Sequence, residues 1–412
     1  MKNYFNFLIV LIISVIGIDR VNIAPDNFLE FTLTPYIFFS IIFFLSLVLF
    51  RYKKINLNWI FKDIKLVFLL LSLFLFISLS VLTSVDIYFS FKRFFLFMFT
   101  LSFMILYFSS FPKSQINKNL LYGSVFGSLL YYLFNFLLLI DWFGVYNIYS
   151  SYINLNPDTL SYFIPRLGGF SLDVNRGGFV LVVFTYLLIV NDKKNNFINL
   201  LIFLNVFFIF CTLSRTSIVF FIISSAIYFL LYVNKNRKFQ FFKISLLSLF
   251  VFIGAISVLS KNDVIKLDEV IEERFSLEDR KHDSSASIHF MLIRDAKNEI
   301  FSNLRIFFLG IGHGMSFKLI DGYRMSYSKN ANYHSQYLSI FVENGFFAFI
   351  SFLLLTLIYP IFFKNNIYLP LMVGSFFYNI FYQLINEPSF WLIIFLFYYA
   401  NNRDLINDEN IY

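Results

Sequence analysis

The sequence predicts an all-α, polytopic membrane protein. It would have about twelve transmembrane helices and one large outer loop between the ninth and tenth. Three observations predict this fold class. Hydrophobic residues form 58% of the 412 residues, charged residues only 14%, and the mean hydropathy is +0.72. Apolar runs long enough to cross a bilayer follow one another along the chain. One long polar stretch, 261–336, interrupts them and contains all four histidines.

Twelve apolar runs between charged residues are the candidate spans. Because the backbone in lipid must satisfy its own hydrogen bonds, we expect each run to be a helix. A run such as Leu66–Ile77, broken only by Ser72, lacks the alternation of a barrel strand. The predicted spans lie near residues 4–18, 33–50, 66–83, 94–108, 120–140, 177–190, 198–213, 218–234, 244–260, 337–359, 367–385 and 390–400.

The distribution of Lys and Arg predicts the orientation of these spans. With the N-terminus inside, basic residues in the inner segments outnumber those in the short outer segments, so both termini are expected in the cytoplasm. The long loop then lies outside, where its acidic residues balance its basic ones. The predicted division is residues 1–260 with helices one to nine, 261–336 as the outer loop, and 337–412 with helices ten to twelve and a cytoplasmic tail.

The sequence does not support a nucleic-acid partner, an internal disulfide, a phosphate-binding loop or a metal site. The net charge of +8 is explained by cytoplasmic loops, and no basic stretch interleaved with aromatic residues lies outside the membrane, so no nucleic-acid partner is expected. The single cysteine, Cys211, allows no internal disulfide. The Gly310–Gly314 run resembles a phosphate loop but lacks a strand–helix unit, which favours a turn. The loop acids lack metal-ligand spacing with His282 or His289, so we predict a solvated surface and no metal site; these acids are Glu272, Glu273, Asp279 and Asp283.

Four polar clusters fall on the predicted outer side, and they contain the candidate functional residues. Two precede or join spans in the middle of the chain, one is expected to be a short helix on the membrane surface, and one lies where the loop re-enters the bilayer. In chain order they are 166–178 with Arg166 and Asn175, 214–217 with Arg215, 288–300 with Arg294, and 333–345 with Tyr333, His334 and Gln336.

Each residue also has a simpler interpretation. An Arg at a helix end usually reaches the lipid headgroups, and a single His at a helix start is more often a capping or interfacial residue. Arg215 differs, because it lies in a short turn between two apolar runs, where an unpaired charge is costly. Together, several guanidiniums on one side suit a diphosphate, and an adjacent imidazole can accept a proton. A helix N-terminus and nearby arginines would keep His334 neutral, as a base requires.

These motifs resemble the bacterial O-antigen polymerase and O-antigen ligase superfamily. The resemblance rests on a Gly-Phe-x-x-Asp-x-Asn segment, the Ser-Arg-Thr turn, a large late outer loop, and His-Ser-Gln-Tyr-Leu followed by Glu-Asn-Gly. In topology it covers most of the chain. In residues it is confined to roughly 155–350 and is strongest at Ser214–Thr216 and His334–Gly345. Residues 173–175 read Asp-Val-Asn where the family usually has Asp-Pro-Asn.

The resemblance implies a GT-C-like, inverting, metal-independent glycosyltransferase of the inner membrane, with no cofactor. Its donor would be an oligosaccharide on undecaprenyl diphosphate, presented at the periplasmic face. Arg215 and Arg294 would bind the diphosphate and stabilise the leaving group, and His334 would activate the acceptor hydroxyl. Arg166 would assist. A chain-length regulator and a flippase are implied as partners. Binding of the donor is expected to extend to Asn175, Tyr333 and Gln336.

Three alternatives stay open at the level of sequence. A ligase shares the fold, the donor and the Arg/His arrangement but transfers the glycan to lipid A-core. The commonest amino acids of the chain mostly have AT-rich codons, and the low-GC gene that they indicate weakly favours the polymerase. A capsule or exopolysaccharide polymerase of a Gram-positive bacterium would have a similar sequence. A transporter, such as a flippase of the same lipid-linked unit, is less favoured because no internal repeat is apparent and most charges lie at span edges. A scaffold protein would not need arginines gathered on one side.

Overall fold

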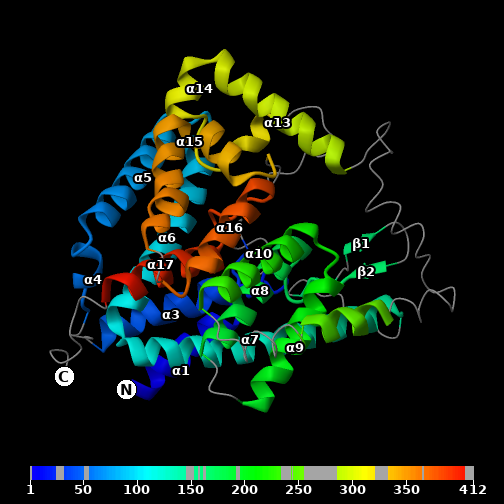
Figure 1. The fold of residues 1–412 in the computed structure, drawn as a ribbon. Coiled ribbons are helices and arrows are strands. Elements are labelled where there is room, and N and C mark those ends of the chain that lie inside the picture. The colour runs from blue at the N-terminus through cyan, green and yellow to red at the C-terminus, as the bar shows by residue number, and fades with distance from the viewer. Residues whose placement is uncertain are drawn as a thin grey trace. The chain divides into compact units, whose positions relative to one another are not determined.

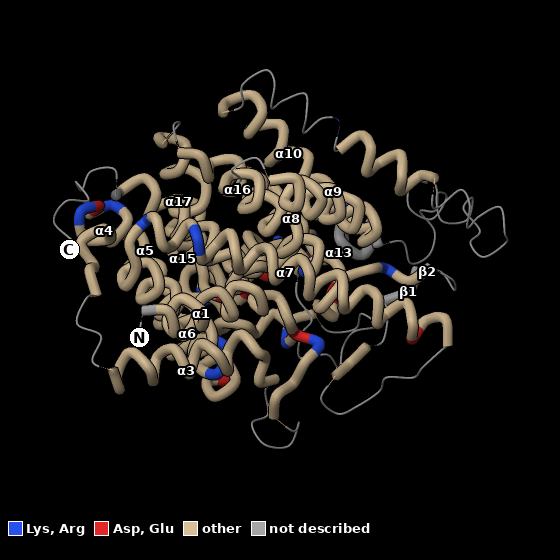
Figure 2. Tube along the Cα trace, turned by 90° about the horizontal axis from the view of Figure 1, so that it is seen from below, with Lys and Arg blue, Asp and Glu red and all other residues tan. Residues whose placement is uncertain are grey.

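The structure, a computed structural model, contains a helix within every predicted span, although several of these helices are shorter than predicted. It describes residues 2–24, 32–50, 55–144, 153–155, 158–160, 164–191, 195–232, 243, 245–254, 285–320, 333–363 and 366–403. Within these residues, six helices are long and apolar enough to cross a membrane, and five shorter apolar helices accompany them. The chain is therefore a multi-pass membrane protein, whereas the number of spans stays a prediction. Charged residues are sparse along it (Figure 2).

The long helices have the following bounds. They are α5 (Ile64–Leu82), α6 (Ile87–Ser110), α7 (Lys113–Trp142), α8 (Val174–Asn191), α10 (Arg215–Tyr232) and α15 (Gln336–Leu353), which continues through a π-helical turn (Leu354–Ile358) and a 3-10 turn (Pro360–Phe362). The shorter elements are α1 (Lys2–Ser14), α3 (Pro35–Leu49), α4 (Asn58–Phe61), α9 (Asn196–Cys211), the helix 245–254, α13 (Ser285–Ser302), α14 (Leu304–Leu309), a 3-10 turn (Ser316–Lys318), α16 (Leu369–Phe381) and α17 (Pro388–Arg403).

Polar side chains set several helix starts, although the spans themselves are apolar. Thr34 directly precedes Pro35, the first residue of α3, and its hydroxyl accepts a hydrogen bond from the Ile37 amide at 3.4 Å. The Asp63 carboxylate accepts one from the Leu66 amide at 3.1 Å and starts α5. Such caps satisfy amides that have no partner within the helix. The helix starts therefore follow the polar residues that separate the apolar runs.

The chain forms two compact units, and each combines segments that are distant in sequence. The first comprises Met1–Lys54 and Ser110–Ser276, and the second comprises Ile55–Ser109 and Leu277–Tyr412. In the first unit α1 packs against α3 and α7, α7 against α8, and α8 against α9 and α10 (Figure 1). The predicted division at residues 260 and 336 follows the expected topology and stays a prediction.

A short β-hairpin adds to the predicted all-α architecture of the first unit. Strands β1 (Asp158–Leu160) and β2 (Ile164–Arg166) are antiparallel, with Asp158 opposite Arg166. The hairpin lies in the connection between α7 and α8, outside every predicted span. Hydrophobic periodicity gives no signal for strands of this length. Its consequence is that Arg166 ends a strand rather than a helix.

In the second unit α5 and α14 pack against α15, α13 packs against α14 and α15, and α16 packs against α17 (Figure 1). Every residue of α17 from Phe390 to Tyr399 is buried. A helix that is apolar all round and enclosed by protein belongs to a core. The last predicted span therefore lies inside its unit.

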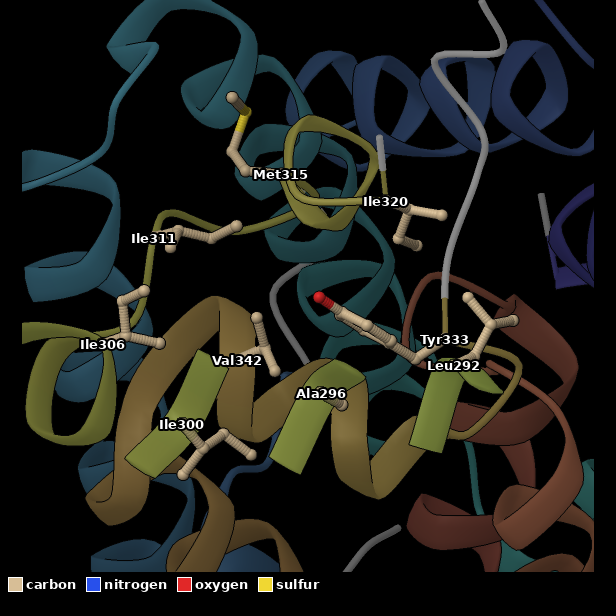
Figure 3. Close-up of a cluster of buried hydrophobic side chains, with 9 residues drawn as sticks. All are labelled: Leu292, Ala296, Ile300, Ile306, Ile311, Met315, Ile320, Tyr333 and Val342. Carbon is tan, nitrogen blue, oxygen red and sulfur yellow. The ribbon is translucent and has the colours of Figure 1, made fainter. Parts of the chain in front are cut away.

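A second hydrophobic group lies under α13. It contains Leu292, Ala296 and Ile300 from one face of α13, together with Ile306, Ile311, Met315, Ile320, Tyr333 and Val342. Their spacing of four residues places the three α13 side chains on one face of the helix (Figure 3). The helix expected over 288–300 is thus confirmed, and it is amphipathic. Its location on the membrane surface stays a prediction.

Candidate functional site

The first unit brings together the two mid-chain clusters predicted from sequence. Asn175 lies in the first turn of α8, and the Ser214 hydroxyl donates to its side-chain oxygen at 2.7 Å. The Ser217 hydroxyl donates to the Asn175 carbonyl at 3.2 Å. The Arg166 Nε donates to the Thr212 carbonyl at 3.2 Å. Hence Asn175 is hydrogen-bonded directly to the 214–217 turn, and Arg166 is hydrogen-bonded to Thr212, two residues before that turn.

A close approach of α8 and α10 accompanies these hydrogen bonds. A Cβ atom on Gly178 would lie 2.3 Å from the Ser217 hydroxyl oxygen. A Cβ atom on Gly177 would lie 2.1 Å from the Gly168 carbonyl oxygen. Real side chains do not fit at such distances, so the Gly-Gly pair at the start of α8 serves packing. The sequence alone did not assign this role to the glycines.

Arg215 occupies the first position of α10 and is exposed. Among the residues that the structure describes, it has no hydrogen bond or ion pair. The N-terminal end of a helix carries a partial positive charge, which adds to that of the guanidinium and favours an anion there. Two residues earlier, Leu213 has a positive φ of 52°. Such a conformation is strained for a branched residue and is characteristic of functional sites.

Two other arginines of the first unit hold the 166–178 segment in place. Arg20 is 1% exposed; its Nε donates to the Gly169 carbonyl at 2.9 Å, and one terminal nitrogen donates to the Asn154 carbonyl at 3.1 Å. Arg176 forms an ion pair with Asp19. These contacts come from the connection after α1, far away in sequence. Sequence reasoning did not find this structural role of Arg20 and Arg176.

Asp19 anchors the same segment through further bonds. One carboxylate oxygen accepts the Leu172 amide at 2.6 Å, and the other accepts the Ser171 hydroxyl at 3.2 Å. Hydrogen bonds to a carboxylate are stronger than those between neutral groups. Asp19 and Arg20 thus fix the backbone that leads from Arg166 to Asn175.

In the second unit, Arg294 lies on the solvent-facing side of α13. Its side chain is 69% exposed, and its Nε lies 3.8 Å from a carboxylate oxygen of Asp295. An exposed contact of this length contributes little to stability. The neighbouring residues Leu292 and Ala296 point into the hydrophobic group under the helix. The burial of one face therefore presents Arg294 outward.

Tyr333 and His334 differ in their surroundings. Tyr333 is 1% exposed and lies within the hydrophobic group (Figure 3). Burial raises the pKa of its phenol, and the carboxylates of Glu299, Glu343 and Asp295 raise it further, so the phenol is neutral. His334 is half-buried and has a positive φ of 49°. Both residues precede α15, and His334 stands two positions before its first residue.

Gln336 is buried and uses its side chain to hold the chain beyond α16. Its side-chain oxygen accepts the amides of Leu384 and Ile385, each at 2.6 Å. The backbone amide of Gln336 donates to the Tyr382 carbonyl at 3.1 Å. The indole nitrogen of Trp391 donates to the Ile385 carbonyl at 2.6 Å and secures the same segment. The start of α15 is thus fixed to the α16–α17 connection.

The glycine-rich run resembling a phosphate loop forms a turn whose amides face a carboxylate of the protein. Glu343 of α15 is 2% exposed. Its carboxylate accepts the Gly314 amide at 2.9 Å, the Ser316 amide at 3.4 Å and the Ser316 hydroxyl. The carboxyl group of Glu343 therefore occupies the position that a phosphate would take in a phosphate-binding loop. The sequence placed Glu343 in a motif but gave no sign of this contact.

His313, within the same turn, is a buried histidine that sequence reasoning did not select. It is 0% exposed, and its Nδ1 lies 3.3 Å from the side-chain oxygen of Asn344. Burial lowers the pKa of His313 to about 4; Arg93 lowers it further, and the neighbouring side chains of Asn386 and Asn344 oppose the shift. The imidazole is therefore neutral at physiological pH.

The predicted residues are thus divided between the units. The first unit joins Arg166, Asn175 and the turn that carries Arg215. The second unit contains Arg294, Tyr333, His334 and Gln336, with Tyr333 packed beneath the helix that carries Arg294. The predicted action of both sets on one substrate stays a prediction.

The comparison with protein families agrees with the motifs. Residues 200–353 match the family model described as O-antigen ligase. The match contains Arg215, Arg294 and His334, together with Tyr333 and Gln336. A comparison with curated proteins gave no match. This match confirms, over residues 200–353, the predicted resemblance to the O-antigen ligase and polymerase superfamily.

Proposed function

We propose that the protein is a surface-polysaccharide polymerase that joins oligosaccharide repeat units carried on undecaprenyl diphosphate. The observation that carries the proposal is the family match over 200–353, which contains the exposed Arg215 and Arg294 and a histidine beside a helix start. The donor is amphipathic, with a lipid tail for the bilayer and a diphosphate for the guanidiniums. The reaction takes place at the periplasmic face of the inner membrane, with both termini in the cytoplasm.

In this proposal Arg215 and Arg294 bind the diphosphate. Each planar guanidinium can hold two phosphate oxygens at once, and the positive charge stabilises the negative charge that develops on the leaving group. Arg166, held at Thr212, and Asn175, held at Ser214, support the position of Arg215 and extend the binding site. Tyr333 and Gln336 border the site beside His334. The guanidiniums supply the charge that a divalent cation supplies in other transferases, so no metal is required.

His334 is proposed as the general base. A hydroxyl of the acceptor sugar attacks the anomeric carbon of the donor while His334 takes the hydroxyl proton. A new glycosidic C–O bond forms, the bond from the anomeric carbon to the diphosphate oxygen breaks, and undecaprenyl diphosphate leaves. Attack from the face opposite the leaving group inverts the anomeric carbon. A chain-length regulator and a flippase are the partners that this reaction implies.

A ligase is the second candidate, because the matching family model is described as O-antigen ligase. The donor chemistry would be the same, and only the acceptor would differ. Disruption of the gene in its host separates the two activities. Loss of a polymerase leaves lipopolysaccharide with a single repeat, whereas loss of a ligase leaves bare lipid A-core.

We expect complementation of this disruption to depend on Arg215 and His334. Arg215→Ala loses the bidentate phosphate contact and His334→Ala loses the base, so neither restores long polysaccharide, although both proteins reach the membrane. Gel electrophoresis of the glycan measures the outcome. Arg305→Ala is the matched control, because the Arg305 side chain is exposed and its guanidinium donates a hydrogen bond to the Thr83 carbonyl. Full-length polysaccharide from either test variant removes that residue from the mechanism.

A further inference from the structure

The helix that follows His334 is divided by a break. Gly345 has φ 80° and ψ 178°, which is not helical, so residues 336–344 form a short half-helix of their own. A Cβ atom on Gly345 would lie 2.2 Å from the Phe308 carbonyl oxygen. An isolated helix of this length is marginal in stability. Its position therefore depends on contacts with other segments.

The C-terminal end of this half-helix is held by the glycine-rich turn. The break removes the helical partners of the last carbonyls, and the turn replaces them. The Ile311 amide donates to the Val342 carbonyl at 3.0 Å, and the Gly312 amide donates to the Glu343 carbonyl at 2.9 Å. The Ser80 hydroxyl donates to the same Glu343 carbonyl. Carbonyls at a helix end need such partners when they are buried.

The Glu343 side chain adds a second connection between the half-helix and the turn. Its three hydrogen bonds from Gly314 and Ser316 join residues that the backbone bonds do not reach. Breaking one partner of a buried, charge-assisted hydrogen bond leaves the other group unsatisfied. Glu343 thus holds the turn and the half-helix in a fixed position relative to each other.

The N-terminal end is held by Gln336, which bonds Leu384, Ile385 and the Tyr382 carbonyl. His334 lies two residues before this anchor. It is half-buried, and its neighbours Tyr333 and Ser335 are 1% and 6% exposed. A non-glycine residue keeps a positive φ only where its surroundings enforce it. The direction of the imidazole is therefore set by the backbone that the two anchors hold.

We propose that Glu343 is a positioning residue for His334. The inference rests on the proposed function, in which His334 is the base. Glu343 itself is enclosed by the turn and does not touch the reacting atoms. Weakening its contact with Ser316 lets the half-helix shift and moves the imidazole, and a displacement of about 1 Å can reduce turnover by roughly 100-fold.

The test uses Glu343→Gln and the milder Ser316→Ala in the full-length protein, in detergent or vesicles. Ser302→Ala is the matched control, because Ser302 is exposed and bonds only a carbonyl of its own helix among the described residues. With an undecaprenyl-diphosphate-linked repeat unit as donor, kcat is expected to fall by roughly 10- to 100-fold in both test variants, while KM for the donor stays within about twofold. Ser302→Ala keeps the wild-type values.

A second readout does not depend on activity. The rate at which diethyl pyrocarbonate acylates His334, followed by peptide mass spectrometry over a pH series, reports the surroundings of the imidazole. Both test variants are expected to change this rate or its pH profile, and Ser302→Ala is not. If Glu343→Gln does not fold, the acylation of His334 in Ser316→Ala alone tests the positioning role of Glu343.

The two proposals fail in different ways. Transfer by His334→Ala at the wild-type rate would overturn the proposed function, while the acylation profile would still report on Glu343. Unchanged acylation of His334 in Ser316→Ala and in folded Glu343→Gln overturns the positioning role. So does a wild-type kcat in both variants when His334→Ala is inactive.

Discussion

His313 and His334, both in the second unit, have different surroundings and different chemistry. His334 is half-buried at the start of α15, whereas His313 is enclosed in the glycine-rich turn. A base must meet solvent or substrate to exchange its proton, which His334 can do. His313 instead pairs with Asn344, beside Arg93 and Glu343. We therefore assign His334 to the reaction and His313 to the stability of the turn.

The buried His313 predicts loss of stability in acid. Its pKa is 6.5 in an unfolded chain and about 4 in the folded protein. As pH falls from 6.5 to about 4, the unfolded chain binds a proton that the folded protein does not. The free energy of unfolding should therefore decrease by up to about 3 kcal/mol over this window. The decrease in Tm between pH 7.5 and 4.5 measures it.

The matched variants for this prediction are His313→Gln and His334→Gln. His313→Gln removes the titrating group, so its Tm should depend less on pH than that of the wild type. His334→Gln should keep the wild-type dependence. Equal pH dependence in wild type and His313→Gln would show that His313 does not carry the effect.

At this scale the sequence predicted residue types better than their contacts. Arg215 was selected because an unpaired charge in a short turn near lipid is energetically costly and is usually functional. In the structure Arg215 is exposed at the start of a helix. Glu343 and His313 were passed over, because their importance comes from a contact between residues about thirty positions apart in the chain. No local pattern records such a contact.

The helix α15 shows how an element can be predicted correctly and still differ in detail. The apolar run predicted a helix over 337–359, and the helix is present. The break at Gly345 was not predicted, because a single glycine in an apolar run is tolerated in many helices. The break becomes evident only from the positive φ and from the close approach of the Phe308 carbonyl.

Substitution of Gly345 is expected to be severe. Gly345→Ala would place a Cβ 2.2 Å from the Phe308 carbonyl oxygen at a φ of 80°. Strain and overlap together predict a loss of at least about 2 kcal/mol in the free energy of unfolding. Thermal unfolding in detergent measures it. Gly254→Ala is the control, because nothing lies within 4 Å of its added Cβ, and its Tm should match the wild type. Equal stability of both variants would contradict the break.

The molecule as a whole shows which features apolar patterns predict. Within the described residues each apolar run contains a helix, because lipid and a buried core both demand a hydrogen-bonded backbone. The division into two units could not be predicted, since the first unit joins residues 1–54 to 110–276 and the second joins 55–109 to 277–412. Likewise, hydropathy does not separate a lipid-facing helix from α17, which protein encloses.

The predicted orientation can be tested by labelling single cysteines. In a Cys211→Ala background the chain has no other cysteine. Lys318→Cys, in the predicted outer loop, should react with a membrane-impermeant maleimide added to intact cells from which the outer membrane has been removed. Lys62→Cys, in a predicted inner segment, should react only after permeabilisation. Both side chains are exposed. The reverse pattern would place the loop in the cytoplasm and contradict the orientation.

The central claim is that an imidazole and guanidiniums, without a metal, transfer a glycan from a lipid diphosphate. The most direct measurement is the initial rate of glycan elongation by the purified protein in EDTA, with wild type beside His334→Ala. The account predicts elongation by the wild type in EDTA and a rate lower by roughly 100-fold or more in the variant. Elongation by His334→Ala at the wild-type rate, or a wild-type rate abolished by EDTA and restored by a divalent cation, would contradict it.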